Sequence, residues 1–336
     1  MNGILGAIGD TPLVALRRYL LRPDVDVWAK LESANPGGSA KDRPAARMIR
    51  DAVASGQIDL GTTVVESSSG NMGIGLAQAC RYHGLRLIVV VDARAQRASV
   101  QAMRALGADV RVVTRPDPET GDLLVARLNA VRRLLAELPN CFWPDQYANE
   151  SNPAAHAAGT MREIDEALEG ALDYLFVATS TTGTLGGCAD YLREHGRATR
   201  LVAVDSTGSA LFGGRRDRRV IPGFGAGVET SLSAAADYDE LMRVSDLDCV
   251  VGCRRLAERE AVLAGGSSGG VAFALESAAA QMAPGSRCAV IFPDGGSGYL
   301  DTVYDDAWVE SELGCSPARL AARIAEGEHL SLPSFP

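Results

Sequence analysis

The feature that most constrains this chain is the alternation of short β-rich segments with segments of helical periodicity. The β-rich segments predict strands at residues 25–31, 63–66, 85–91, 109–114, 174–178, 200–205 and 288–292. Helical patterns occupy residues 45–54, 72–83, 100–106, 185–194, 270–281 and 317–325, and a Pro-rich, loose end is expected after them. Strands that alternate with helices predict an α/β protein with parallel sheets covered by helices on both faces.

Size, hydropathy and charge narrow the class of protein. With 336 residues, the chain is long enough for about two domains and a sizeable core. It has no apolar run of the ~18 residues that a membrane span needs, and its start lacks the features of a secretory signal. We therefore expect a cytoplasmic protein that does not bind membranes. The formal charge of −9 also argues against a general nucleic-acid surface.

The seven cysteines and four histidines do not suggest a metal site. Only Cys249 and Cys253 lie close together, and no second Cys or His pair completes a zinc set. An odd number of thiols, mostly in apolar contexts, predicts buried and reduced cysteines.

Glycine-rich turns carry the chemical information, because ligands of doubly wound sheets bind at the carboxyl ends of strands. The first turn, at residues 35–44, places Lys41 near a helix start, where the helix dipole disfavours an ammonium ion. This location suits a lysine that must lose its proton to form a Schiff base. Taken alone, the turn is also compatible with a solvated surface lysine, which is the commoner case.

Three further turns offer hydroxyl groups at helix starts. The second, at residues 66–73, would cradle a carboxylate, although Ser69 or Asn71 could simply cap the helix. The third suits a phosphate group and comprises Ser180, Thr181, Thr182, Gly183 and Thr184. It is not a nucleotide P-loop, because no Gly-Lys-Ser/Thr follows it. The fourth turn spans residues 265–270.

At these turns the sequence resembles the cysteine synthase/cystathionine β-synthase family of fold-type II pyridoxal-phosphate enzymes. The resemblance is collinear from about Ile8 to Asp301. It includes the motifs Gly9-Asp10-Thr11-Pro12-Leu13, Asp145-Gln146-Tyr147-Ala148-Asn149 and Gly223-Phe224-Gly225-Ala226-Gly227. The resemblance implies two doubly wound domains: a smaller, mobile one at 36–144, and a larger one at 1–35 and 145–316 that binds the cofactor phosphate. A C-terminal helix and tail would occupy 317–336.

The resemblance also implies roles for individual residues. Lys41 would form the internal aldimine with pyridoxal 5'-phosphate, Asn71 would contact the cofactor O3′, and Ser267 would hydrogen-bond the pyridine nitrogen. The third turn, Ser180 to Thr184, would hold the cofactor phosphate. The substrate α-carboxylate would be bound by Gln146 and by the second turn, which comprises Ser67, Ser68, Ser69, Gly70 and Asn71. The loop that begins at Gly223 would line the cleft.

The residue at the pyridine nitrogen bears on the type of reaction. The neutral hydroxyl of Ser267 does not keep this nitrogen protonated as a carboxylate would, so the ring is a weaker electron sink. Prompt loss of a β-leaving group is then favoured over long-lived carbanion chemistry. The implied reaction is a β-replacement: Lys41 removes the α-proton, an aminoacrylate forms, and a nucleophile adds at Cβ with ping-pong kinetics.

Departures from the ordinary cysteine synthase pattern indicate a branch of the family. The phosphate turn usually reads Gly-Thr-Gly-Gly-Thr, but here Ser180 and Thr182 replace two glycines, and Tyr147 stands where Phe is common. With Asn35-Pro36-Gly37-Gly38-Ser39 and Phe292-Pro293-Asp294, these features resemble the branch that joins O-phospho-L-serine and L-glutamate into N-(2-amino-2-carboxyethyl)-L-glutamate. That branch serves 2,3-diaminopropionate and siderophore biosynthesis. The open alternatives are a cysteine synthase using O-acetylserine or O-phosphoserine, a serine or threonine dehydratase, and an idle, cofactor-binding regulatory partner.

A dianionic phosphoserine needs a local cation in an acidic protein. Arg127 aligns with a basic position of this branch and is the phosphate candidate, with Tyr147 and Ser180 as hydrogen-bond donors. A surface helix arginine is the alternative for Arg127. The basic run at residues 215–219 is the next candidate, although it could equally be a solvated loop. Family members are usually homodimers, so the resemblance implies a homodimer that acts on small amino acids.

Overall fold

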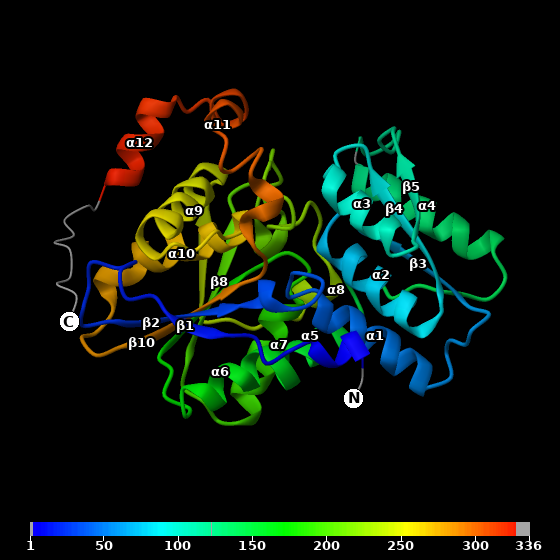
Figure 1. Ribbon diagram of the computed structural model, residues 1–336, viewed down its shortest axis with the longest axis horizontal. Coiled ribbons are helices and arrows are strands. Elements are labelled where there is room, and N and C mark those ends of the chain that lie inside the picture. The colour runs from blue at the N-terminus through cyan, green and yellow to red at the C-terminus, as the bar shows by residue number, and fades with distance from the viewer. Residues whose placement is uncertain (1–2, 122, 327–336) are drawn as a thin grey trace.

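The computed structural model describes residues 3–121 and 123–326, and its strands form two separate sheets (Figure 1). The larger sheet has the order β1-β2-β10-β7-β8-β9. Its strands are β1 (Leu13–Ala15), β2 (Asp26–Leu31), β7 (Tyr174–Ala178), β8 (Arg200–Ser206), β9 (Glu240–Val244) and β10 (Arg287–Phe292). All neighbours pair in parallel except β1, which is antiparallel to β2. The expected parallel sheets are present, and the larger one carries one antiparallel strand at its edge, where β1 and β2 are joined directly, without the helical crossover that parallel pairing needs.

The smaller sheet is parallel throughout and has the order β5-β4-β3-β6. Its strands are β3 (Thr63–Ser67), β4 (Arg86–Asp92), β5 (Asp109–Val113) and β6 (Cys141–Phe142). Every residue of β3 is buried, and so is every residue of β4 except Arg86. This near-continuous burial is typical of strands whose two faces are both covered.

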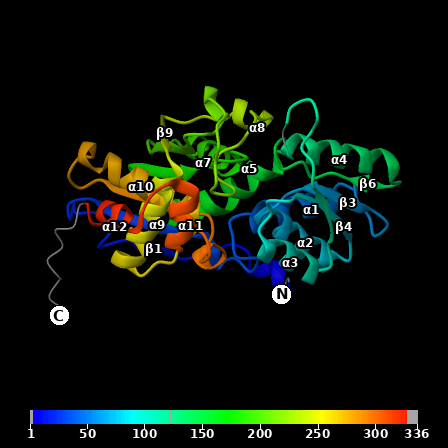
Figure 2. The same cartoon turned by 90° about the horizontal axis from the view of Figure 1, so that it is seen from above.

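The helices divide between the two sheets (Figures 1 and 2). Beside the smaller sheet lie α1 (Asp42–Ala54), α2 (Asn71–His83), α3 (Arg97–Ala105) and α4 (Leu123–Glu137). The other helices are α5 (Ser151–His156), α6 (Arg162–Ala167), α7 (Gly183–Glu194), α8 (Ser231–Ala234), α9 (Asp246–Glu260), α10 (Gly266–Ala278), α11 (Asp306–Leu313) and α12 (Pro317–Ala325). A π-helical turn, Ala157–Met161, joins α5 to α6. Short 3-10 segments lie at Gly3–Ala7, Glu32–Ala34, Leu211–Gly213, Ala279–Gln281 and Gly296–Tyr299.

Apolar clusters lie on both faces of each sheet. One face of the larger sheet packs against α9, α10 and α12, and the other packs against α6 and α7. One face of the smaller sheet packs against α1, α2 and α3, and the other packs against α4. The prediction of sheets covered on both faces is thus confirmed. The reason is that strands with continuous apolar runs keep water away only when both faces are buried.

The described residues also bear on the other sequence predictions. All seven cysteines are free thiols, and all but Cys141 are buried. Within residues 3–121 and 123–326, no helix is both long enough and apolar enough to cross a membrane. The predicted helix at 317–325 is present as α12, whereas most of the loose end expected after it lies outside the described residues.

Candidate active site

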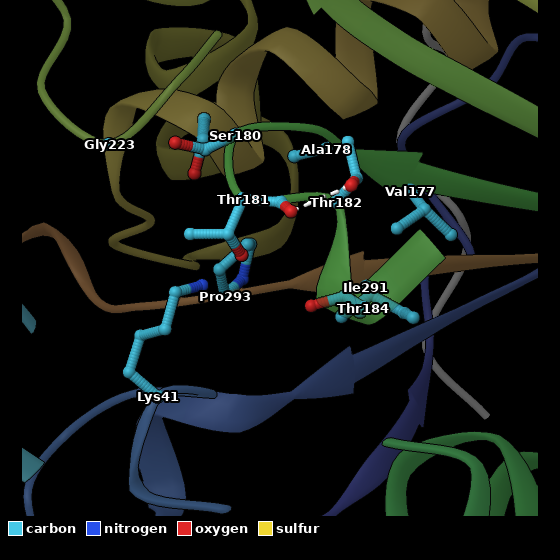
Figure 3. A pocket seen from close by; sticks show the side chains of 11 residues that line it. Lys41, Val177, Ala178, Ser180, Thr181, Thr182, Thr184, Gly223, Ile291 and Pro293 are labelled. Carbon is cyan, nitrogen blue, oxygen red and sulfur yellow. Dashed lines mark hydrogen bonds between the residues drawn. The ribbon is translucent and has the colours of Figure 1, made fainter. Parts of the chain in front are cut away.

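A pocket lies at the carboxyl ends of β7 and β10, where α1, α7 and α10 begin. It is lined by Lys41, Val177, Ala178, Ser180, Thr181, Thr182, Thr184, Gly223, Ser267, Ile291 and Pro293. Figure 3 shows the Lys41 side chain extending towards Thr181 and Pro293. The space among these residues is about 390 Å³, part of it open to solvent. The structure thus brings residues of the first, third and fourth turns into one pocket.

Lys41 is the side-chain amine of this pocket. It immediately precedes α1, and the neighbouring Ala40 N–H donates to the Pro293 carbonyl at 2.8 Å, which ties the turn to the end of β10. The only other lysine in the sequence, Lys30, is buried and paired with Glu163 at 2.7 Å. Burial lowers the pKa of Lys41, although the charges of Asp294 and Glu32 oppose this shift. A lowered pKa increases the share of neutral amine, the form that attacks an aldehyde.

The hydroxyl-rich turn before α7, Ser180 to Thr184, packs against α5. Asn152 Nδ2 donates to Thr181 Oγ1 at 3.2 Å, and a Cβ on Gly183 would clash with the Asn152 amide. Thr182 adopts the left-handed conformation, with a φ of 65°, as the chain turns into the helix. Hydroxyl donors at a helix N-terminus fit a phosphate group. Together with Lys41, they fit pyridoxal 5'-phosphate.

His156 is a second support that the sequence analysis missed. It lies one helical turn after Asn152, and its Nε2 is 3.3 Å from Thr184 Oγ1. Its Nδ1 contacts Thr160 Oγ1 at 3.0 Å. Burial, and then the charges of Lys41 and Arg43, hold the pKa of His156 well below its usual value. A neutral imidazole therefore orients the Thr184 hydroxyl without adding charge beneath the turn.

Asp294 is another residue of this site that sequence analysis did not assign. Its Oδ2 accepts from Asn71 Nδ2 at 2.8 Å and from Tyr299 Oη at 2.9 Å. Its Oδ1 is buried without a partner, and burial raises the pKa of this carboxyl. Asp294 lies two residues after the end of β10, and its place at the carboxyl end of a central strand was the available signal. The Asn71 bond links the start of α2 to the Lys41 pocket.

The second turn, before α2, does not line the pocket of Figure 3 but keeps groups available for an anion. Neither Ser69 nor Asn71 caps the helix, since the N-cap residue is Gly70 and the helix N–H of Gly73 donates to Ser68 instead. The Ser67 hydroxyl is buried without a partner, while Ser68 Oγ accepts from the Gly73 N–H at 3.0 Å. The simple capping alternative is therefore wrong for this turn.

Gln146 and Glu66 join the second turn to the motif at residues 145–149. Gln146 Nε2 donates to the Ser67 carbonyl at 3.1 Å. Glu66 accepts from the Ser67 N–H at 2.7 Å, from Trp143 Nε1 at 3.2 Å and from the Gln146 N–H at 3.3 Å. Burial raises the pKa of Glu66 to about 7 despite these three donors. Glu66 is a buried support that the sequence analysis used only as the first residue of its turn.

Arg127 reaches the second turn from α4. Its Nη1 donates to Ser69 Oγ at 2.7 Å, and its Nε lies 3.3 Å from Asp92 Oδ2. The side chain is only 12% exposed, so the surface-arginine alternative is wrong. Burial raises the pKa of Tyr147, whereas the charges of Arg127 and, to a lesser degree, Arg219 act to lower it. Tyr147 thus lies within electrostatic reach of Arg127, but neither residue lines the Lys41 pocket.

A buried ionic cluster holds the Lys41 turn against the larger sheet. Arg43 Nε lies 2.7 Å from Glu32 Oε2, and Arg43 Nη1 lies 2.6 Å from Glu163 Oε1. Glu163 also pairs with Lys30, and the four charged side chains are at most 8% exposed. Buried charges are tolerated when each is paired in this way. Because Arg43 is two residues from Lys41, the cluster restrains the direction of the amine.

Known proteins match this chain over nearly its full length. The family described as "Pyridoxal-phosphate dependent enzyme" matches residues 4–294. The N-(2-amino-2-carboxyethyl)-L-glutamate synthase of Ralstonia nicotianae is 43% identical, over 97% of this chain and 94% of its own. The synthase of the same name from Cupriavidus metallidurans is 41% identical, over 99% and 96%.

Solved structures agree with the fold. The O-acetylserine dependent cystathionine β-synthase from Helicobacter pylori superposes with a TM-score of 0.83 at 32% identity, covering 90% of this chain and 98% of that one. O-ureido-L-serine synthase superposes with a TM-score of 0.81 at 31% identity, covering 92% and 99%. The family match and these relatives bear out the resemblance first noted at the glycine-rich turns. The chain belongs to the pyridoxal-phosphate dependent enzymes, with the fold of the cystathionine β-synthase-like members.

Proposed function

We propose that this enzyme replaces the phosphate of O-phospho-L-serine with the amino group of L-glutamate. The products would be N-(2-amino-2-carboxyethyl)-L-glutamate and phosphate, for 2,3-diaminopropionate and siderophore biosynthesis. The observation that carries the proposal is the identity of 41% and 43%, over nearly the whole chain, to synthases named for this product. The Lys41 pocket supports it, because a β-replacement needs an amine, a phosphate cradle and a pyridine partner in one place.

The residues of the chain divide the chemistry among them. When bound, pyridoxal 5'-phosphate supplies an aldehyde and a conjugated ring that draws electrons from the Cα of an amino acid. Lys41 Nζ is the base that removes the Cα proton and later returns it. Ser180 to Thr184 hold the cofactor phosphate, Asn71 and Ser267 hold its ring, and Gly223 lines the cleft. The turn at residues 67–71, with Gln146, holds the substrate α-carboxylate.

The leaving phosphate is assigned to Arg127, Tyr147 and Ser180. Arg127 already donates to Ser69, so it reaches the turn that would hold the substrate carboxylate. Ser180 Oγ donates to the Gly225 carbonyl at 3.2 Å, in the loop that carries Gly223. A guanidinium and hydroxyl donors in a partly desolvated site suit a dianion.

The direct test is to supply the purified enzyme with O-phosphoserine or O-acetylserine and with glutamate or sulfide, and to identify products by mass. We expect the glutamate adduct and an equal amount of phosphate from the phosphoserine–glutamate pair. Cysteine synthase is the second candidate, favoured by the structural likeness to an O-acetylserine dependent enzyme. Efficient formation of cysteine from sulfide, with no glutamate adduct, would show that the enzyme is a cysteine synthase.

The family resemblance leads to further proposals about the whole protein. We propose a cytoplasmic homodimer in which residues 36–144 form a mobile domain. This domain would move against a larger one at 1–35 and 145–316 when substrate binds. The elements of the smaller lobe, from α1 to β6, span residues 42–142 and are compatible with such a unit.

A further inference from the structure

The acceptor in the proposed reaction, L-glutamate, carries two carboxylates. A site for it needs a cationic side chain that is not already paired with a carboxylate of the protein. Several cations near the pocket do not meet this condition. Arg43 is engaged by Glu32 and Glu163, and Lys30 by Glu163. Arg127 is paired with Asp92 and is assigned to the leaving phosphate.

Arg219 meets the condition. Arg215, Arg216 and Arg218 of the same basic run are exposed, whereas Arg219 is only partly exposed. Its Nη1 donates to the Phe224 carbonyl at 2.8 Å, and its Nε is buried without a hydrogen-bond partner. Across the described ranges 3–121 and 123–326, Arg219 forms no ion pair with a carboxylate.

The loop next to Arg219 is fixed against the phosphate turn. The Gly225 N–H donates to the Thr179 carbonyl at 2.7 Å, and Ser180 Oγ donates to the Gly225 carbonyl at 3.2 Å. Gly225 has a φ of 67°, and a Cβ on it would lie 3.2 Å from Arg219 Nη1. Because the loop also carries Gly223 of the Lys41 pocket, the guanidinium is held at a set position relative to that pocket.

Arg219 is also close enough to Tyr147 for its charge to act on the tyrosine hydroxyl. The charges of Arg127 and Arg219 both act on the Tyr147 hydroxyl, opposing the rise in its pKa that burial causes. The Tyr147 carbonyl accepts from the Leu232 N–H of α8 at 3.2 Å. Arg219 therefore contacts the Gly223–Gly227 loop through the Phe224 carbonyl and lies within electrostatic reach of Tyr147.

Two carboxylates, Asp205 and Asp246, act electrostatically on Arg219, and each keeps one oxygen buried without a hydrogen-bond partner, Oδ2 of Asp205 and Oδ1 of Asp246. Asp205 Oδ1 accepts from Thr179 Oγ1 at 3.0 Å and from the Ser206 N–H at 2.9 Å, and Asp246 Oδ2 accepts from the Val220 N–H at 2.9 Å. Burial lowers the pKa of Arg219, and these two carboxylates only partly oppose it. A guanidinium that is desolvated in this way gains most from an added anion.

We propose that Arg219 binds a carboxylate of the second, nucleophilic substrate and thereby selects an acidic amino acid. The inference rests on the proposed function, in that the acceptor is an amino acid whose amine attacks Cβ. It assigns the acceptor site to the rim formed by Arg219 and the Gly223–Gly227 loop. The donor site comprises residues 67–71, Arg127 and Tyr147.

The test compares Arg219→Gln with Arg215→Gln, which removes an exposed arginine from the same run. Single-turnover phosphate release from phosphoserine, without acceptor, reports the donor half of the reaction and should be similar in wild type and both variants. The KM for glutamate should rise by about tenfold or more in Arg219→Gln alone, since one charge-assisted bond is lost. Arg219→Lys should recover part of this loss.

A competition between glutamate and glutamine separates recognition of charge from damage to the fold. Glutamine has the same shape without the side-chain charge, so the preference of the wild type for glutamate should fall about tenfold or more in Arg219→Gln. An unchanged preference would overturn the inference. Slowed phosphate release that matches the loss of glutamate use would also overturn it, because Arg219 would then only support the fold with Asp205 and Asp246.

These outcomes are distinct from failure of the proposed function. That failure would show in wild type and in Arg215→Gln alike, as phosphate release without any glutamate adduct. A wild type that makes the adduct, with an Arg219→Gln variant that discriminates equally well, would leave the function standing and remove only the role of Arg219.

Discussion

At the scale of single residues, Lys41 should be the covalent attachment point of the cofactor. The sequence has only one other lysine, and Lys30 is buried in an ion pair with Glu163. We expect wild type to be yellow and Lys41→Ala to lack both the visible band of the cofactor–lysine linkage and measurable turnover. Borohydride reduction followed by peptide mapping should place the modified lysine at residue 41. A colourless wild-type protein, or a label on Lys30, would contradict the assignment.

Arg127 and Tyr147 should recognise the leaving group. Charge-assisted hydrogen bonds are worth roughly 1.5–3 kcal/mol, so loss of either group should slow phosphate release from phosphoserine by about tenfold or more. The rate of cofactor absorbance change should be measured for Arg127→Ala and Tyr147→Phe with phosphoserine and with acetylserine. Acetylserine has no phosphate and should be affected much less. Equal losses with both donors would mean that these residues support the fold.

Glu66 should make the stability of the protein depend on pH. Burial raises its pKa to about 7, from an ordinary value of 4.5, so the folded state holds the proton more tightly than the unfolded state does. The stabilisation is therefore complete below about pH 4.5 and is lost as pH rises to about 7. Relative to Glu66→Gln, which does not ionise, wild type should lose roughly 3 kcal/mol over this window. Urea unfolding at several pH values measures the free energy of unfolding of both proteins. If the two free energies changed with pH in the same way, Glu66 would ionise with an ordinary pKa.

At the scale of elements, the close approach of α7 to α5 places the phosphate turn. A Cβ on Gly187 would clash with the Pro153 carbonyl, whereas a Cβ on Gly186 would meet only Pro153 Cβ at 3.6 Å, an ordinary contact. Gly187→Ala should therefore destabilise the protein by about 1–3 kcal/mol and weaken cofactor binding. Gly186→Ala is the matched control and should be neutral or slightly stabilising, since Ala favours a helix. Fluorescence titration of the apoenzyme with pyridoxal 5'-phosphate measures the affinity for the cofactor. Equal affinity in both variants would mean that the packing of α7 against α5 does not position the phosphate turn.

At the scale of the whole molecule, the two proposed domains, 36–144 and 1–35 with 145–316, should move towards each other when substrate binds. The turn at residues 67–71 begins α2 of the smaller lobe, while Lys41 and the phosphate turn contact the ends of β10 and β7. Binding the substrate carboxylate would pull the lobes together and exclude water from the reacting atoms. Crystals with and without a bound substrate analogue should differ in the angle between the two sheets. The same angle in both would argue against a mobile domain at 36–144.

The sequence by itself determined the features that depend on local pattern. Continuous apolar strands alternating with helices specify sheets that must be covered on both faces, and the described structure has both sheets covered. Hydroxyl-rich and glycine-rich turns must lie at the carboxyl ends of those strands, which brought Lys41, the Ser180–Thr184 turn and Ser267 into one pocket. The resemblance could be noted for the same reason, because motifs of this kind are contiguous.

The tertiary structure alone decided which distant side chains meet. Asp294 lies 223 residues from Asn71, Arg127 lies 58 residues from Ser69, and Glu163 lies 120 residues from Arg43. No local periodicity encodes such pairs, since each depends on how two lobes and several helices pack. The same holds for Arg219, which the sequence places in an exposed-looking basic run and the fold places against the Phe224 carbonyl. Charge, burial and partners of a side chain are properties of the packed chain, and they decide which arginine is free to bind an anion.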